Sequence, residues 1–286
     1  MASTSGIGHI ETPSAEGPAI ASLPDFLAAS DAWYRKYSVK DHGMLSDLWY
    51  RGVNRHFDSQ VPGVYRPNFT ARAAALEGTK ALEEKRLELE RNMLSQFRGA
   101  GAQFLENRSL PQLYFLAQHF GMPTRLLDWS TNPLAALYFA CVGEPKADGF
   151  IYAMDAKQII PPNALRANVP PRREKLFQRV MTMRHDFVEY AIGISFWEPI
   201  NQDYNPFVLP IRPDTVPGRI GQQNSCFTLH MHGAQPASNP TMITMRVDAA
   251  RKPAILEELH RVNINQFTIF HDLDHLSREI RKGWNA

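Results

Sequence analysis

Cysteine is scarce in this sequence of 286 residues, which holds two, Cys141 and Cys226. Both are flanked by apolar residues, which is typical of buried free thiols in a reducing compartment. Two thiols cannot supply the ligands of a structural zinc site, and no paired-cysteine spacing is present. The sequence therefore predicts reduced, buried cysteines and no metal site.

Long apolar runs and a strong charge imbalance are also missing. No stretch approaches the roughly 20 apolar residues that a membrane helix needs, and the N-terminus lacks the basic start and apolar core of a secretory signal. We therefore expect a cytoplasmic protein that does not contact a membrane. The net charge of +2 neither requires nor excludes a nucleic-acid partner. The most basic segment, residues 172–190, is either a binding surface or the solvated face of a helix.

Several short catalytic motifs are absent. The sequence contains no G-x-G-x-x-G fingerprint, no P-loop and no H-E-x-x-H zinc motif. A G-x-S-x-G nucleophile elbow is missing as well. These absences argue against a Rossmann dehydrogenase, a P-loop nucleotidase, a zinc protease and a hydrolase with a nucleophile elbow.

The pattern of apolar residues predicts strands and helices that are interleaved but unevenly spaced. Residues 1–21 are rich in small and polar residues, and we expect a flexible or loosely docked leader. Residues 22–286 then form a single domain with helical and loop insertions. We expect strands at 48–53, 150–154, 226–231, 241–247 and 264–270, helices at 71–97, 172–190, 252–260 and from 272, and long loops at 54–70 and 201–218. This order favours an α+β fold, a mixed or antiparallel sheet with flanking helices.

Polar residues are concentrated in one otherwise apolar stretch, residues 117–140, which includes His119, Thr124, Arg125, Asp128 and Trp129. Residues around this stretch indicate where its helices begin and end. Ser109 before Pro111, and Asn132 before Pro133, are typical of helix N-caps, and Gly121 is suited to end a helix. Arg125 and Asp128 need partners if they are buried, so they either pair with each other or cap a helix.

The same stretch carries a family resemblance. QHFGMPTRLLDWSTNPLAALYFA resembles the signature of the FRG domain family, whose Phe/Tyr-Arg-Gly motif is matched by Tyr50-Arg51-Gly52. A third family block is matched by RIGQQNSCFTLH at residues 219–230, although three residues separate Gln223 from Phe227 where the family has a single glycine. The resemblance covers roughly residues 48–274.

At the level of the fold, the resemblance extends to ADP-ribosyltransferases, which implies a site that binds NAD as a substrate. It implies that Arg51 contacts the phosphates or ribose of NAD, and that Gln223 stands near the position of a catalytic glutamate. The remaining residues of the implied pocket are Tyr50, Gly52, Thr124, Arg125, Asp128, Trp129 and Ser130. Because a neutral amide cannot stabilise a developing cation as a carboxylate does, Asp128 or Glu198 is the alternative to Gln223.

Each of these residues also has a structural interpretation. Arg51 could form a buried ion pair with Asp128, and Gln223 could close its loop by a hydrogen bond. His119 is either a satisfied imidazole at a helix end or a general base toward an incoming acceptor. Trp129 is either a core residue or a stacking surface for nicotinamide or a nucleobase.

The resemblance implies an enzyme that modifies a macromolecule, either a protein or a nucleic acid, in the setting of a bacterial toxin or a phage-defence effector. Such an effector would have an antitoxin or regulatory protein as a partner. The alternative is a non-catalytic module that binds a nucleotide, a nucleic acid or a protein through the same pocket. A purely structural adaptor is the weakest hypothesis, because it does not need so many polar residues within an apolar block.

Overall fold

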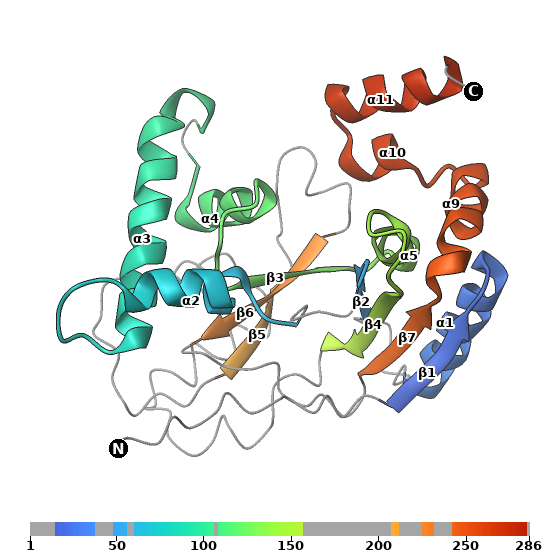
Figure 1. Cartoon of the computed structure of the whole chain (residues 1–286), viewed down its shortest axis with the longest axis horizontal. Helices are drawn as coiled ribbons and strands as arrows, with labels where there is room; N and C mark the ends of the chain where they lie inside the picture. The colour runs from blue at the N-terminus through green and yellow to red at the C-terminus, as the bar shows by residue number, and fades with distance from the viewer. Residues whose placement is uncertain are drawn as a thin grey trace.

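A mixed sheet of seven strands forms the centre of the part of the chain that the computed structural model describes, which comprises residues 15–37, 48–55, 60–105, 108–156, 207–211, 225–231 and 242–284 (Figure 1). The strand order is β1-β7-β4-β2-β3-β6-β5. The strands are β1 (Ala15–Ile20), β2 (Leu48–Val53), β3 (Leu126–Ser130), β4 (Gly149–Asp155), β5 (Phe207–Ile211), β6 (Ser225–Met231) and β7 (Ile243–Val247). β1 pairs with β7 in parallel, and the other pairs are antiparallel. This arrangement confirms the α+β fold with a mixed sheet.

Eight α-helices accompany the sheet in these described segments. They are α1 (Leu23–Tyr37), α2 (Pro67–Ala74), α3 (Leu82–Ala100), α4 (Leu110–His119), α5 (Pro133–Cys141), α9 (Lys252–Arg261), α10 (Gln266–Phe270) and α11 (Leu273–Trp284). None of the described helices combines the length and apolar character that crossing a bilayer requires. Both cysteines are free and buried, as the sequence predicted.

Local capping sets the boundaries of the central stretch as expected. The Ser109 side chain accepts a hydrogen bond from the backbone of Gln112 at the start of α4, and Asn132 accepts one from the backbone of Leu134 at the start of α5. Gly121, which follows α4, has a φ of 80°. β3 therefore lies between two helices whose ends are fixed by their own sequence.

Other elements differ from the sequence-based predictions. β1 lies within the expected leader and pairs with the distant strand β7, and β5 lies within the expected loop at 201–218 and pairs with β6, the next strand in the chain. The predicted helix at 71–97 is two helices, α2 and α3, separated by a segment in which Gly78 has a φ of 101°. The predicted strand at 264–270 is instead the helix α10. Its capping box, in which Asn265 and Thr268 exchange hydrogen bonds, overrides the strand preference of its aromatic and β-branched residues.

The helices cover the sheet in two groups. α1, α5 and α9 pack with β2, β4 and β7 around a core that includes Phe26, Leu137, Ile151 and Ile255. α3 and α4 pack with β3, β5 and β6 around a second core that includes Leu94, Phe115 and Leu229. Figure 1 shows these groups on opposite sides of the β2–β3 boundary, with α10 and α11 beside α5 and α9.

The boundary between β2 and β3 is the weakest join in the sheet. Tyr50 and Ser130 are the single residue pair in register there, whereas β2 and β4 pair over six positions. The ladder between β2 and β3 therefore ends at Tyr50, one residue before Arg51. This early end leaves the Arg51 side chain at the point where the two halves of the sheet part.

Gly52 allows α5 to pack directly against β2. A Cβ atom added to Gly52 would lie 1.8 Å from the carbonyl oxygen of Ala136, which is backbone and cannot rotate away. We therefore expect Gly52→Ala to lower the free energy of unfolding by about 1–3 kcal/mol through overpacking. Denaturant melts of the purified variant would measure this loss.

Gly99 is the matched control for this substitution. It lies within α3, and a Cβ atom there would meet nothing within 4 Å. Gly99→Ala should leave stability unchanged or raise it by about 0.5–1 kcal/mol, because alanine loses less backbone entropy in a helix. Equal stability of the two alanine variants would show that a side chain at position 52 can be accommodated without loss of packing between α5 and β2.

Candidate functional site

A cavity of about 430 Å³ lies where β2 and β3 part, between the two groups of helices. Its lining comes from seven elements: Tyr50, Arg51 and Gly52 of β2, Gln118 and His119 of α4 with the adjoining Phe120, Asp128, Trp129 and Ser130 of β3, Ala135, Ala136 and Phe139 of α5, Ser225 and Phe227 of β6, Phe270 of α10 and His275 of α11. This volume is in the range of small-molecule sites in proteins. The motifs around Arg51 and Asp128 therefore meet at one pocket, as the sequence predicted.

Arg51 is held at the edge of this cavity by β3. Its Nη1 atom donates a hydrogen bond to the backbone carbonyl of Asp128 at 2.8 Å, and it lies 3.9 Å from the Asp128 carboxylate. The Arg51 side chain is 12% exposed. Burial lowers the pKa of the guanidinium, and the nearby Asp128 carboxylate opposes that shift. Arg51 therefore joins the two halves of the sheet while its charge lies at the cavity.

Asp128 presents an oriented carboxylate to the same cavity. Its side chain is 56% exposed, and Gln118 Nε2 donates to Oδ2 at 2.9 Å. The Gln118 amide is in turn fixed because Thr124 Oγ1 donates to Oε1 at 2.5 Å. Thr124 was expected to line the pocket. It lies outside the lining and instead orients the Gln118 side chain, which contacts Asp128. Sequence reasoning missed Gln118, although it stands next to His119 in the central stretch.

Tyr50 and Ser130 are the residues through which β2 and β3 pair. Burial raises the pKa of Tyr50 to about 12, so its hydroxyl stays protonated near neutral pH. Ser130 is 8% exposed and its Oγ accepts a hydrogen bond from the backbone of Asn132 at 2.9 Å. Both residues line the cavity, where the sequence analysis expected them.

Aromatic rings form two walls of the cavity. His119 and Phe120 stand edge to face at the C-terminal end of α4, with ring centroids 5.4 Å apart, and Phe120 is 62% exposed. On the other side, Phe139 lies edge to face with Phe270 at 5.8 Å, and Phe270 stacks on His275 at 4.2 Å. The sequence left open whether His119 faces the pocket, and the structure places it in the lining. The wall from α10 and α11 was missed, because residues 264–270 were predicted as a strand.

Arg125 lies outside the cavity lining, which corrects the expectation that it binds a ligand. Its side chain is 0% exposed, and its Nε donates to Glu90 of α3 at 2.8 Å. The backbone N–H of Arg125 and the hydroxyl of Tyr114 also donate to this carboxylate. Burial by itself would lower the pKa of Arg125, but the Glu90 carboxylate raises it above its usual range. Arg125 is therefore a structural residue whose partner is Glu90 and not Asp128.

Two further residues that line the cavity also have packing roles. Trp129 is 5% exposed and belongs to a core cluster with Leu127 and Cys226, and its indole N–H donates to Thr228 Oγ1 at 3.0 Å. The ring thus packs on the face of β3 opposite to Asp128, because alternate side chains of a strand point to opposite faces. Gly52 accommodates α5, as described above.

The third family block is described in part. Its residues 225–230 lie in β6, which pairs with β3, and Ser225 lines the cavity opposite Ser130 in the strand register. Gln223, the expected counterpart of a catalytic glutamate, and Glu198 both lie outside the described residues. The same holds for the basic segment 172–190.

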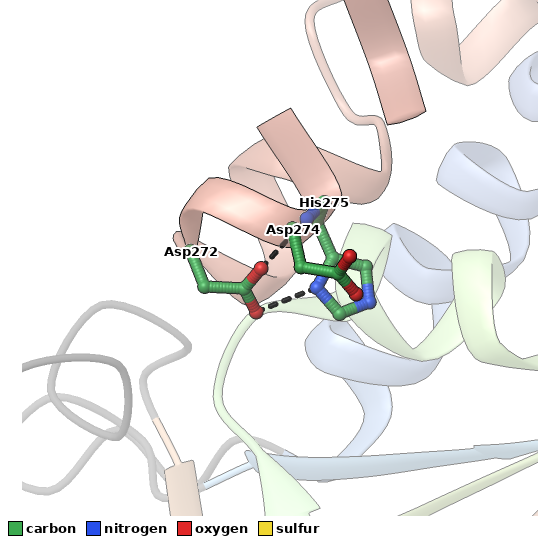
Figure 2. Close-up of side chains that lie close together, drawn as sticks. All are labelled: Asp272, Asp274 and His275. Carbon is green, nitrogen blue, oxygen red and sulfur yellow. Dashed lines mark hydrogen bonds and ion pairs between the residues drawn. The ribbon is translucent and has the colours of Figure 1, made fainter. Parts of the chain in front are cut away.

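One cluster of potential metal ligands occurs among the described residues, formed by Asp272, Asp274 and His275 (Figure 2). One ligand atom from each lies within 4.8 Å of the others. However, both oxygens of Asp272 already accept hydrogen bonds from His275, one from its backbone and one from its ring. We therefore read the cluster as a capped helix start with an oriented imidazole.

Comparison with known families gives one match. The model of the FRG domain matches residues 46–149, a little over a third of the chain. The matched segment contains Arg51, Gln118, His119 and Asp128 of the cavity. No curated protein and no solved structure gives a significant match to the chain.

Proposed function

Taking the FRG domain at residues 46–149 as the premise, we propose that the chain is an ADP-ribosyltransferase-like enzyme that uses NAD as a substrate to modify a macromolecule. One observation carries this proposal. A guanidinium, an oriented and exposed carboxylate and several aromatic rings converge on a single cavity of about 430 Å³. A dinucleotide offers a chemical partner to each of these groups.

Arg51 is the residue best suited to the pyrophosphate of NAD. A guanidinium presents several N–H groups in a plane and can hold two phosphate oxygens at once. One N–H of Arg51 is used by the Asp128 carbonyl at 2.8 Å, which fixes the direction of the fork. Its low exposure strengthens the interaction with a phosphate, because water screens the charges less.

Asp128 is proposed to stabilise the positive charge that develops on the ribose. In the reaction, the bond between ribose C1′ and the nicotinamide nitrogen breaks, and nicotinamide leaves with the bonding electron pair. A carboxylate placed near C1′ favours that step electrostatically. Gln118 holds the Asp128 carboxylate in one orientation before the ligand arrives. Gln223 would then need only to hydrogen-bond a ribose hydroxyl.

The aromatic walls and hydroxyl groups suit the nicotinamide ring. Phe120, Phe139 and Phe270 offer flat apolar surfaces against which an aromatic ring can pack. Ser130 and Ser225 lie paired on neighbouring strands and offer hydroxyl groups for a carboxamide. His119 stands on the α4 side of this wall.

The biological setting that we propose is a cytoplasmic toxin or phage-defence effector, with a protein or nucleic acid as the acceptor and an antitoxin or regulatory protein as a partner. A non-catalytic binding module is the second candidate. It is favoured by Gln223, an amide where the resemblance to ADP-ribosyltransferases leads one to expect a carboxylate.

Incubation with NAD separates the two candidates. We expect the purified protein to release nicotinamide from NAD, measured by chromatography. NADH is the matched control, because it shares the phosphates and riboses but its uncharged dihydronicotinamide is not a leaving group. It should bind, as measured by calorimetry, without release. Saturable NAD binding with no nicotinamide released would support the binding module instead.

A further inference from the structure

His275 is an oriented imidazole on the wall of the cavity, supplied by a helix that lies outside the matched FRG segment. It stands in the first turn of α11, three residues after Asp272. Asp272 Oδ1 accepts a hydrogen bond from the backbone N–H of His275 at 2.6 Å, and Oδ2 lies 2.5 Å from its Nδ1 (Figure 2). Because an ionised carboxylate can only accept, Nδ1 carries the hydrogen in this pair.

The ring of His275 is fixed on a second side by aromatic packing. Phe270 stacks on it, with 4.2 Å between the ring centroids and an angle of 17° between the planes. Phe270 in turn packs against Phe139 of α5. The imidazole therefore has a defined plane and a defined tautomer, with Nε2 as its basic nitrogen. The side chain of His275 is 19% exposed.

We propose that His275 is the general base of the transfer reaction, with Asp272 as the residue that positions it. This inference rests on the proposed function. As nicotinamide leaves ribose C1′, an incoming hydroxyl group forms a new C1′–O bond. Its proton moves to Nε2 of His275, and Asp272 stabilises the imidazolium that results. The proton is later lost to water, which restores the neutral ring.

The chemistry of a base at this position indicates the class of nucleophile. A carboxylate or thiolate acceptor has no proton to give up, and so it needs no base. A hydroxyl group or a water molecule does, and histidine is the side chain best suited to accept a proton near neutral pH. We therefore expect the nucleophile to be a hydroxyl group of the acceptor, and water to act as the nucleophile when no acceptor is present.

His119 is the competing base, because it lines the opposite wall of the cavity. One feature favours His275: its Nδ1 is held by the Asp272 carboxylate, which can stabilise the charged ring. Asp274 lies in the same cluster on its own helix, and Arg51 and Asp128 line the same cavity as His275.

NAD hydrolysis by the full chain tests the proposal, with water as the nucleophile. We expect His275→Gln to lower kcat by about 100-fold while KM changes by about twofold at most, because the base acts on the nucleophile and not on NAD binding. In Asp272→Asn the one amide oxygen keeps the helix cap, so the NH2 group faces Nδ1 and cannot accept from it; kcat should fall by at least about tenfold. Asp274→Asn removes a neighbouring charge without touching the dyad and is the matched control.

The pH profile and chemical rescue distinguish a base from a structural residue. The wild-type kcat should rise with pH along a limb that Asp274→Asn retains and His275→Gln loses. Added imidazole should restore part of the rate of His275→Ala, which leaves room beside Phe270. Retention of the limb in His275→Gln, or its loss in His119→Gln alone, would overturn the assignment.

The remaining outcomes separate this inference from the proposed function. A wild-type protein that releases no nicotinamide contradicts the proposed function, and the base with it. Release that is unchanged in His275→Gln contradicts the base alone. Release that is abolished by a chelator and restored by Zn²⁺ would also overturn the proposal, since the cluster of Figure 2 would then be a metal site. NAD binding by His275→Gln, measured by calorimetry, verifies that the variant is folded.

Discussion

Arg51→Lys is expected to lower kcat/KM for nicotinamide release from NAD by about 100- to 1,000-fold, because the contact to the pyrophosphate is lost in both the bound substrate and the transition state. Lysine keeps the positive charge but presents a single ammonium in place of a planar fork, so it cannot hold two phosphate oxygens and the Asp128 carbonyl together. Steady-state kinetics with NAD would measure the loss. Thermal melting should remain near that of the wild type, because the charge stays in place.

Arg55→Lys is the control, since Arg55 lies four residues away, pairs with Glu144 and has a side chain that is 48% exposed. It should keep full activity. If instead Arg51→Lys loses stability and activity in proportion, Arg51 is a structural ion pair with Asp128. Full activity and full NAD binding in Arg51→Lys would remove Arg51 from the phosphate site.

Glu90→Gln is expected to have the largest effect on stability, with a loss of about 3–5 kcal/mol in the free energy of unfolding. The amide keeps the size of the side chain and one oxygen acceptor. It nevertheless leaves the guanidinium of Arg125, which is 0% exposed, without its counter-charge. Urea denaturation of the purified variant would measure the change.

Glu88→Gln provides the comparison on the same helix. Glu88 forms an ion pair with Lys80 at the surface, and water screens such pairs, so no measurable change in stability is expected. A small effect of Glu90→Gln would mean that Arg125 finds other compensation. Since Arg125 directly precedes β3, we also expect Glu90→Gln to disturb the position of Asp128 and to reduce activity along with stability.

The boundaries of the central elements were determined by the sequence alone. Ser109 and Asn132 cap α4 and α5 through hydrogen bonds to residues two or three positions away. Gly121 ends α4 through its own φ of 80°. These interactions involve residues that are close together in the chain, so they can be predicted from the amino-acid sequence alone. The alternation of strands and helices likewise indicated the α+β class.

The roles of individual polar residues were decided by tertiary structure. Arg125 and Asp128 stand three positions apart in one polar cluster, yet one is buried against Glu90 and the other is exposed in the cavity. A strand places neighbouring side chains on opposite faces, and what covers each face depends on distant segments. For the same reason, Trp129 joined the core and Gly52 served the packing of α5.

The wall of the cavity that α10 and α11 form also depends on tertiary structure. Arg51 and His275 lie more than two hundred residues apart in sequence and line one pocket. The sequence by itself determined the two motifs that carry Arg51 and Asp128, because each motif is a short run of consecutive residues. The packing of Phe270 against Phe139 and of Ile269 in the first core holds α10 beside the cavity. Such contacts between distant helices depend on the shape of the assembled core and not on any local pattern.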